Sequence, residues 1–333
     1  MVTKEDSMRT RKANLRYRLT ALIVLTGLLT IILTSYSPLS LATSEARKPA
    51  PPSDKVGAVA TSQTKSSFPD RLMLVAAKFV QFTPRGGAIY SILQSGQPVK
   101  SGPLISVNAA SFADKLAPDS IVAGFGSNLA TTTQSAQSMP LPITLAGARV
   151  RVIDSAGIAR FAPLLFVSPT QINYIMPAGT SDGLAAVDVI PEGGGSVIAS
   201  GGAQVTTVAP GIFTVSGTGS PPTAAGKWLR YSGGVLVDSG SLETPIAFGD
   251  QGDKVYLILY GTDIRNRSSL SAVSATIGGS SAVVEYAGPQ GEFPGLDQLN
   301  VLLPPGFVGL DQLIVVVTID GVAANTVKVT AGK

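Results

Sequence analysis

The chain has 333 residues, with 25 Lys and Arg, 21 Asp and Glu, and neither His nor Cys. Without His or Cys it cannot build a Ser-His-Asp triad, a common zinc site, a disulfide or a thiolate nucleophile. Charged residues make up only 14% of the chain, against roughly 25% in an average soluble domain.

The net charge of +4 is unevenly distributed along the chain. Residues 1–42 hold six basic and two acidic residues, and residues 43–101 hold eight basic and three acidic ones. From residue 102 onward there are 11 basic and 16 acidic residues. Nucleic-acid binding needs a basic surface on the folded part, so the composition argues against a nucleic-acid partner.

The first 42 residues have the pattern of an export signal. Six basic residues precede an apolar run over 19–33, and small residues end the segment at Ser40-Leu41-Ala42. This pattern predicts a signal peptide cleaved after Ala42, which makes Thr43 the new N-terminus, with Ala46 as a second cleavage candidate. The alternative is an uncleaved signal anchor, in which this segment alone contacts the membrane. Both interpretations predict an exported protein, at the cell surface, in the periplasm or outside the cell.

Residues 43–104 follow as a predicted linker. Its first part, 43–69, is rich in Pro, Ser, Lys and Ala and has no hydrophobic period, which is typical of disorder. The apolar stretch Asp70–Phe82 is compatible with a short helix or a strand, and Pro84 ends it.

From residue 105 the pattern predicts an all-β fold. Short runs rich in Val, Ile, Leu, Tyr and Phe alternate with Gly, Pro, Ser, Asn and Asp clusters, and no helical period is sustained. Asp320-Gly321 and Ser232-Gly233-Gly234 are hairpin signals. The strands are expected at Ile121–Phe125, Ala148–Ile153, Leu164–Val167, Ile172–Met176, Ala185–Ile190, Val255–Tyr260, Ala282–Tyr286, Leu299–Leu303, Leu313–Ile319 and Thr326–Thr330.

An internal repeat divides this region into two modules. Each half contains a β run with a Gly turn (121–130 and 255–264) and later a Gln-aliphatic-Asn run closed by Pro (171–177 and 298–304). The repeat predicts two tandem immunoglobulin-like β-sandwiches over 105–213 and 240–333, joined by a connecting hairpin over 214–239.

Four phrases carry a resemblance to a known family. They are VNAASFADKLAPDSIVAGFGSNLA (107–130), APLLFVSPTQINYIMPAG (162–179), VAPGIFTV (208–215) and VEYAGPQGEFPGLDQLNVLLP (284–304). The chain from 107 to 333 resembles the Solibacter-type C-terminal domain of uncharacterised acidobacterial secreted proteins, with a looser similarity to IPT/TIG immunoglobulin-like domains. The resemblance implies an extracellular β-sandwich and supplies no activity and no site. Members of that family usually follow longer extracellular repeat domains, which this chain does not contain.

Three aromatic residues are the candidate contacts for a ligand or partner. Trp228, the only Trp, and Tyr231 lie in the predicted connecting hairpin, and Phe293 lies in a seven-residue insertion rich in Gly and Pro. Exposed aromatics can stack on sugar or anchor a partner. The alternatives are that Trp228 fills the junction between the sandwiches and that Phe293 covers the edge of a core.

The sequence indicates no catalytic, cofactor or metal site. The carboxylates are scattered and form no local pair of the kind that glycoside hydrolysis requires. Asp250 and Asp253 could contribute to a calcium loop, although a polar turn explains them as well. The Gln171/Asn173 and Gln298/Asn300 pairs each share one strand face, and we expect them to bond loop backbone.

These observations predict a non-enzymatic exported protein for adhesion, matrix contact or assembly. A carbohydrate-binding module is the alternative, and a carboxylate-based hydrolase is the weakest of the three. The expected partner is an extracellular protein or polysaccharide.

Overall fold

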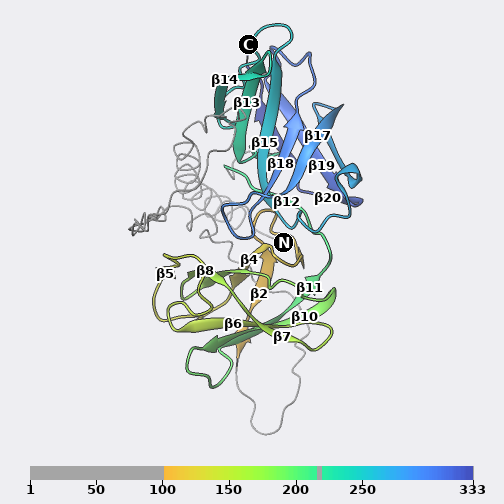
Figure 1. Cartoon of the computed structure of the whole chain (residues 1–333). Coiled ribbons are helices and arrows are strands. Elements are labelled where there is room, and N and C mark those ends of the chain that lie inside the picture. Colours follow the sequence, from red (N-terminus) through yellow and green to blue (C-terminus); the bar gives the residue numbers. More distant parts are fainter. Residues whose placement is uncertain (1–100, 216–219, 333) are drawn as a thin grey trace, which may run out of the picture.

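The computed structural model describes residues 101–215 and 220–332, and Figure 1 shows two β-structured bodies stacked end to end. Within these ranges the only helical element is one 3-10 turn, Leu270–Ala272. The prediction of an all-β, sandwich-like fold is therefore confirmed. The predicted signal or anchor (1–42), its cleavage point at Ala42 and Thr43, and nearly all of the linker lie outside the described residues. No helix in the described part has the length and apolarity needed to cross a membrane.

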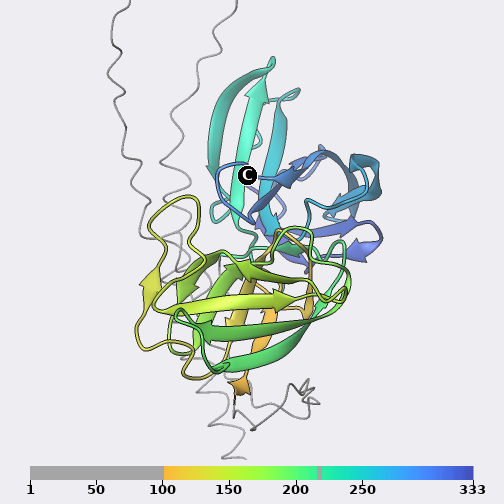
Figure 2. The same ribbon diagram turned by 60° about the horizontal axis from the view of Figure 1, so that its bottom comes forward.

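The first sandwich packs two sheets face to face, as Figure 2 shows. One sheet has the order β1-β11-β10-β6-β7, with β3 beside β11, and the other has the order β2-β4-β9-β8-β5. The strands of the first sheet are β1 (Gly102–Pro103), β3 (Lys115–Leu116), β6 (Ala148–Ile153), β7 (Ala159–Ala162), β10 (Gly183–Pro191) and β11 (Ala199–Val205). Those of the second are β2 (Ile105–Asn108), β4 (Ile121–Phe125), β5 (Gln134–Ser135), β8 (Leu164–Val167) and β9 (Gln171–Ile175).

Alternating burial explains why these segments form a sandwich. On β6, Ala148, Val150 and Val152 are buried, whereas the residues between them are partly exposed. Because side chains on a strand alternate between faces, this pattern turns one apolar face of each sheet inward. On β9 the Tyr174 ring fills the core, and its hydroxyl donates to Ser106 Oγ at 3.0 Å. The buried hydroxyl is thereby satisfied.

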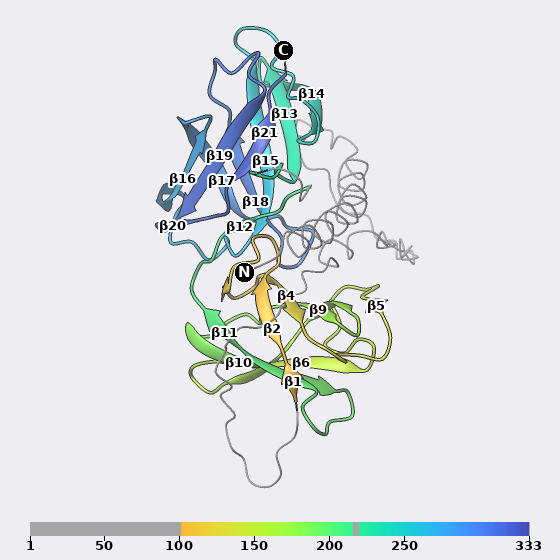
Figure 3. The same cartoon turned by 180° about the vertical axis from the view of Figure 1, so that it is seen from behind.

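The second sandwich is one continuous sheet folded over on itself, seen from behind in Figure 3. Its order is β14-β13-β15-β18-β17-β16-β19-β20, with β12 beside β15 and β21 beside β19. Strand β17 belongs to both layers, because its first residues pair with β16 and its later residues pair with β18. The strands are β12 (Gly211–Ile212), β13 (Gly226–Ser232), β14 (Val235–Ser241), β15 (Lys254–Thr262), β16 (Val273–Ile277), β17 (Ser280–Pro289), β18 (Asp297–Leu302), β19 (Gln312–Ile319), β20 (Val322–Ala323) and β21 (Val327–Thr330).

The predicted connecting hairpin is part of the second sandwich, which corrects the proposed boundary at residue 240. Strand β13 pairs with β15 from Gly226 to Tyr231 and with β14 on its other side. The turn is placed correctly by the sequence, since Gly233 and Gly234 both adopt positive φ, at 57° and 84°. Such a turn matches the twist of its flanking strands, which here join a sheet rather than span a gap between modules.

A third apolar cluster joins the two sandwiches. Ala109, Ala110 and Ala123 of the first sandwich meet Phe213, Ile258 and Tyr260 on the other side. The cluster is continuous with the outward faces of β4 and β15, so the junction buries apolar surface as a core does.

Polar groups also lock this junction. Asn108 Nδ2 donates to Asp263 Oδ2 at 2.6 Å, and the Ala117 backbone N–H donates to the same carboxylate. The Ile121 N–H donates to Thr262 Oγ1 at 2.9 Å. Asn108, Thr262 and Asp263 are almost fully buried. Because buried hydrogen bonds have directional requirements, they fix the orientation of one sandwich on the other.

Candidate functional site

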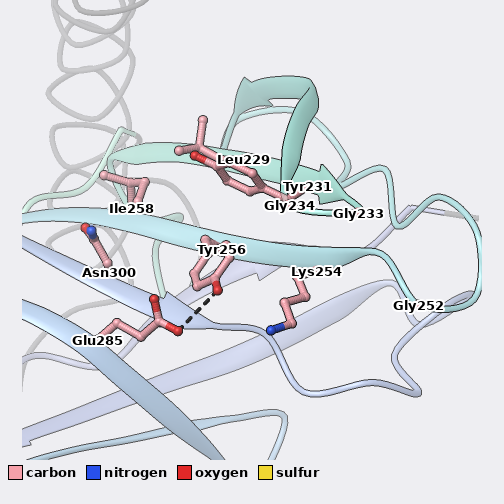
Figure 4. Close-up of a pocket in the computed structure, with 10 residues that line it drawn as sticks. All are labelled: Leu229, Tyr231, Gly233, Gly234, Gly252, Lys254, Tyr256, Ile258, Glu285 and Asn300. Atoms are coloured by element: carbon pink, nitrogen blue, oxygen red, sulfur yellow. Dashed lines mark hydrogen bonds between the residues drawn. The ribbon is translucent and has the colours of Figure 1, made fainter. Parts of the chain in front are cut away.

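One open pocket of about 460 Å³ lies on the outward face of the second sandwich, shown in Figure 4. Strands β13, β15, β17 and β18 provide its walls, and two glycine turns border one end. The lining residues are Leu229, Tyr231, Gly233, Gly234, Gly252, Lys254, Tyr256, Ile258, Glu285 and Asn300. Aromatic, aliphatic and charged groups thus converge on one surface, a composition typical of ligand sites.

Strand alternation places three of these side chains. On β15, Val255, Leu257 and Leu259 point into the core, so Lys254, Tyr256 and Ile258 point outward. Tyr231 of β13 lies directly opposite Lys254 in the ladder. The rings of Tyr231 and Tyr256 meet edge to face, with 5.7 Å between their centroids. This arrangement gives the pocket an aromatic wall with a defined shape.

Glu285 enters the pocket through a β-bulge. Val284 pairs with Val301 and Tyr286 pairs with Asn300, which leaves Glu285 as the extra residue of β17. Bulges redirect a side chain at the cost of ladder bonds, and they are common beside functional sites. Here the Tyr256 hydroxyl donates to Glu285 Oε1 at 3.1 Å. Partial burial, together with the neighbouring carboxylate, raises the pKa of Tyr256, so the phenol stays protonated at neutral pH.

The Asn300 side chain is fixed by its neighbour on β18. Gln298 Nε2 donates to Asn300 Oδ1 at 2.7 Å. In the first sandwich Gln171 Nε2 donates to Asn173 Oδ1 in the same way, at 2.9 Å, but both residues are buried. We expected these amides to bond loop backbone. In this hydrogen bond, the Gln of each pair donates to the Asn of the same pair instead.

Trp228 does not contact a ligand or the junction. Only 4% of the residue is exposed, and it belongs to the core of the second sandwich. Its ring packs over Gly240 so closely that a Cβ there would lie 2.7 Å from the indole. Trp228 faces inward because it alternates with Leu229 and Lys227 on β13, and a buried ring cannot stack on sugar.

Phe293 is also absent from the pocket. Its side chain is partly buried against the junction cluster, and its backbone N–H donates to Gln290 Oε1 at 3.3 Å. The alternative interpretation, in which Phe293 covers the edge of a core, fits this position. Of the three aromatic candidates, only Tyr231 lies in the pocket.

Five acidic side chains outside the pocket form ion pairs with arginine. Asp154 binds Arg160, Asp188 binds Arg151, Asp297 binds Arg265, and both Asp238 and Asp253 bind Arg230. The Arg230 pairing accounts for Asp253, so the Asp250 and Asp253 turn is held by a guanidinium rather than arranged around a cation. Across 101–215 and 220–332, no group of three or more acidic residues is placed to hold a metal ion.

Sequence reasoning missed Lys254, Tyr256 and Glu285. Tyr256 was counted only as part of the β run Val255–Tyr260, and Lys254 lay just before that run, although the alternation in KVYLILY (254–260) separates a polar-aromatic face from an aliphatic one. The signal for Glu285 was the break in alternation at Val283-Val284-Glu285-Tyr286, which is typical of a bulge.

Comparison with known proteins adds little to this geometry. No family model matches the chain and no curated protein does, so the resemblance described above stays a prediction. A solved structure of an auxiliary nutrient binding protein from Bacteroides ovatus is similar over 34% of this chain, at 15% identity and a TM-score of 0.19. The chain spans about a fifth of that protein, and a similarity this low carries no functional argument.

Proposed function

We propose that this chain is a non-enzymatic binding protein of the cell exterior, which makes adhesive contact with a surrounding polymer through the open face of its second sandwich. The observation that carries the proposal is the pocket walled by Tyr231 and Tyr256. Export is supported by the charge and hydropathy of residues 1–42. Five carboxylates are paired with arginine, and these favour a binding role over a hydrolytic one because a paired acid is a poor proton donor.

The openness of the site favours a polymer over a small metabolite. Sites for small molecules enclose most of the ligand surface, whereas this pocket lies on the face of a sheet. The junction cluster reaches the pocket, since Leu229 and Tyr256 pack against it. A ligand on this face is therefore held by a body that includes both sandwiches, as adhesion requires.

Binding of the full chain to immobilised extracellular polysaccharides and matrix proteins tests this proposal. We expect at least one polymer to be retained, and Tyr231→Ala to weaken its binding by about fivefold or more, because a stacking aromatic contributes roughly 1 kcal/mol or more. Phe161→Ala is the control, since Phe161 is an exposed aromatic residue on the first sandwich, away from the pocket. Equal binding by Tyr231→Ala and the wild type would contradict the role of this face.

Assembly is a second candidate, favoured by the edge of the same sheet. On β14, Val235, Leu236 and Val237 are consecutive and are 65%, 48% and 50% exposed. Exposed apolar edge strands tend to pair with another chain. Sedimentation of the full chain at micromolar concentration distinguishes the candidates: assembly predicts dimers or larger species that Leu236→Lys dissolves, whereas a sedimenting monomer rules it out.

A further inference from the structure

The pocket holds a cation and an anion that do not bind each other. Neither Lys254 nor Glu285 belongs to an ion pair within the described part of the chain. The Glu285 carboxylate accepts one hydrogen bond, from the Tyr256 hydroxyl, and the exposed ammonium of Lys254 has no hydrogen-bond partner within the described part of the chain. Figure 4 shows the ends of the two side chains turned toward each other, one on either side of the Tyr256 hydroxyl.

This arrangement selects against charged ligands. A carboxylate or phosphate attracted by Lys254 is repelled by Glu285, and an ammonium attracted by Glu285 is repelled by Lys254. A hydroxyl group suits both, because its oxygen accepts from the ammonium while its proton is donated to the carboxylate. Two adjacent hydroxyls can engage both charges at once, each through a charge-assisted hydrogen bond.

The aromatic wall specifies the rest of the ligand. Tyr231 and Tyr256 meet edge to face, so they offer two differently oriented apolar surfaces beside the charged groups. Leu229 and Ile258 extend that surface. A ligand that fits is apolar on one side and carries hydroxyls on the other, which describes a sugar ring.

We infer that this pocket binds an uncharged carbohydrate, with Lys254 and Glu285 bridging a pair of adjacent hydroxyls and the Tyr231–Tyr256 wall packing against the ring. The inference rests on the proposed binding function and names its ligand class. Glu285 shares the outward face of β17 with the exposed Val283, because Ala282 and Val284 pack against the core.

The test compares immobilised polysaccharides in three charge classes: dextran and xylan as neutral polymers, polygalacturonate as the acidic one, and chitosan as the basic one. We expect the full chain to retain a neutral polymer best, with little change between about 50 and 500 mM salt, because no net charge is exchanged. Periodate, which cleaves the bond between carbons bearing adjacent hydroxyls, should abolish binding when the retained polymer is pretreated.

Substitutions at Lys254 and Glu285 test whether the two charges contribute to polysaccharide binding. We expect Glu285→Gln and Lys254→Met each to weaken binding by about tenfold, since a hydrogen bond to a charged group contributes roughly 1.5–3 kcal/mol. Lys115→Met, at an exposed lysine of the first sandwich, should bind as the wild type does. Unchanged thermal unfolding of each variant confirms that the fold is kept.

Failure of the carbohydrate inference can be told apart from failure of the proposed binding function. Binding that depends on Tyr231 but survives periodate, or is unaffected by both charge variants, overturns the carbohydrate inference and leaves the proposed function standing. Preference for polygalacturonate or chitosan with strong salt dependence overturns the inference in the same way. If no polysaccharide or matrix protein is retained, the proposed function itself fails.

Discussion

Asp154 shows how a single carboxylate organises a loop of the first sandwich. Its side chain accepts from the backbone N–H groups of Ala156 and Ile158 and from Arg160 at 2.6 Å. The hydrogen bond from Arg160, followed by that from Ile158, holds the pKa of Asp154 well below its usual range. The charged form is therefore part of the folded state.

This depressed pKa fixes the sign of a pH effect. The unfolded carboxyl titrates near pH 4, so below about pH 5 the unfolded chain binds more protons and the stabilising contribution is lost as the pH falls. We expect Asp154→Asn to be less stable than the wild type at pH 7, with the difference shrinking toward about pH 2.5. Urea midpoints at both pH values measure it, and Asp114→Asn, at an exposed aspartate, should follow the wild type. A constant difference across this range would contradict the assignment.

At the scale of the strands, β11 contains two consecutive glycines with opposite roles. A Cβ on Gly201 would overlap the backbone oxygen of Leu104, which cannot move without disturbing the neighbouring strands. A Cβ on Gly202 would lie 3.3 Å from Leu184 Cδ1, at the end of an exposed side chain. Only at Gly201 does the backbone of another segment come so close that no side chain fits.

Substituting both glycines in turn tests this reasoning. Gly201→Ala should lower the free energy of unfolding by about 1–3 kcal/mol, as overpacking against rigid atoms does. Gly202→Ala should change it by less than about 0.5 kcal/mol, because Leu184 can rotate away and Ala loses less chain entropy than Gly. Chemical denaturation measures both, and equal effects would show that Leu104 yields as easily as Leu184.

Strand positions were predictable from the sequence because alternation and turn chemistry are local. Ile121–Phe125, Ala148–Ile153 and Leu164–Val167 match the observed strands residue for residue. Pairing partners were not predictable, because the contacts of β13 with β15 depend on residues 23 or more positions apart. The hairpin of Trp228 was therefore assigned to a gap between modules instead of to a sheet.

The candidate site was predictable only in part for the same reason. Tyr231 was identified as an aromatic near a hairpin, which is local information. Its partners Tyr256, Glu285 and Asn300 come from three other strands and are brought together by pairing and by the bulge of β17. A bulge changes which way one side chain points, and nothing in composition reveals that.

At the scale of the whole molecule, the buried polar junction couples the two sandwiches. Burial raises the pKa of Asp263 well above its usual range, although hydrogen bonds from Ser120 and the Ala117 N–H oppose this shift. Asn108 is the side-chain donor that reaches Asp263 from β2, and it also donates to the Ala209 carbonyl oxygen at 2.9 Å. Removing it leaves the Asp263 carboxyl group and the Ala209 carbonyl oxygen without this donor in a buried interface.

Asn108→Ala should therefore weaken the coupling between the sandwiches. We expect the wild type to unfold in a single calorimetric transition, and Asn108→Ala to lose about 2–4 kcal/mol and to separate into two transitions. Ser111→Ala, beside the same turn, is the control, because its hydroxyl accepts only an exposed backbone N–H. A single transition in Asn108→Ala, or two in the wild type, would contradict coupling through this residue.

The order of the elements along the long axis has a mechanical consequence. The described chain enters at β1, at the far end of the first sandwich, while the pocket and its glycine turns lie on the second, as Figure 1 shows for the two bodies. Under the proposed function, a tension between Gly102 and a polymer bound at the pocket would pass through the junction. There Asn108, Ile121 and Asp263 share the load with an apolar cluster, so the force does not fall on the short connection between β11 and β12 alone.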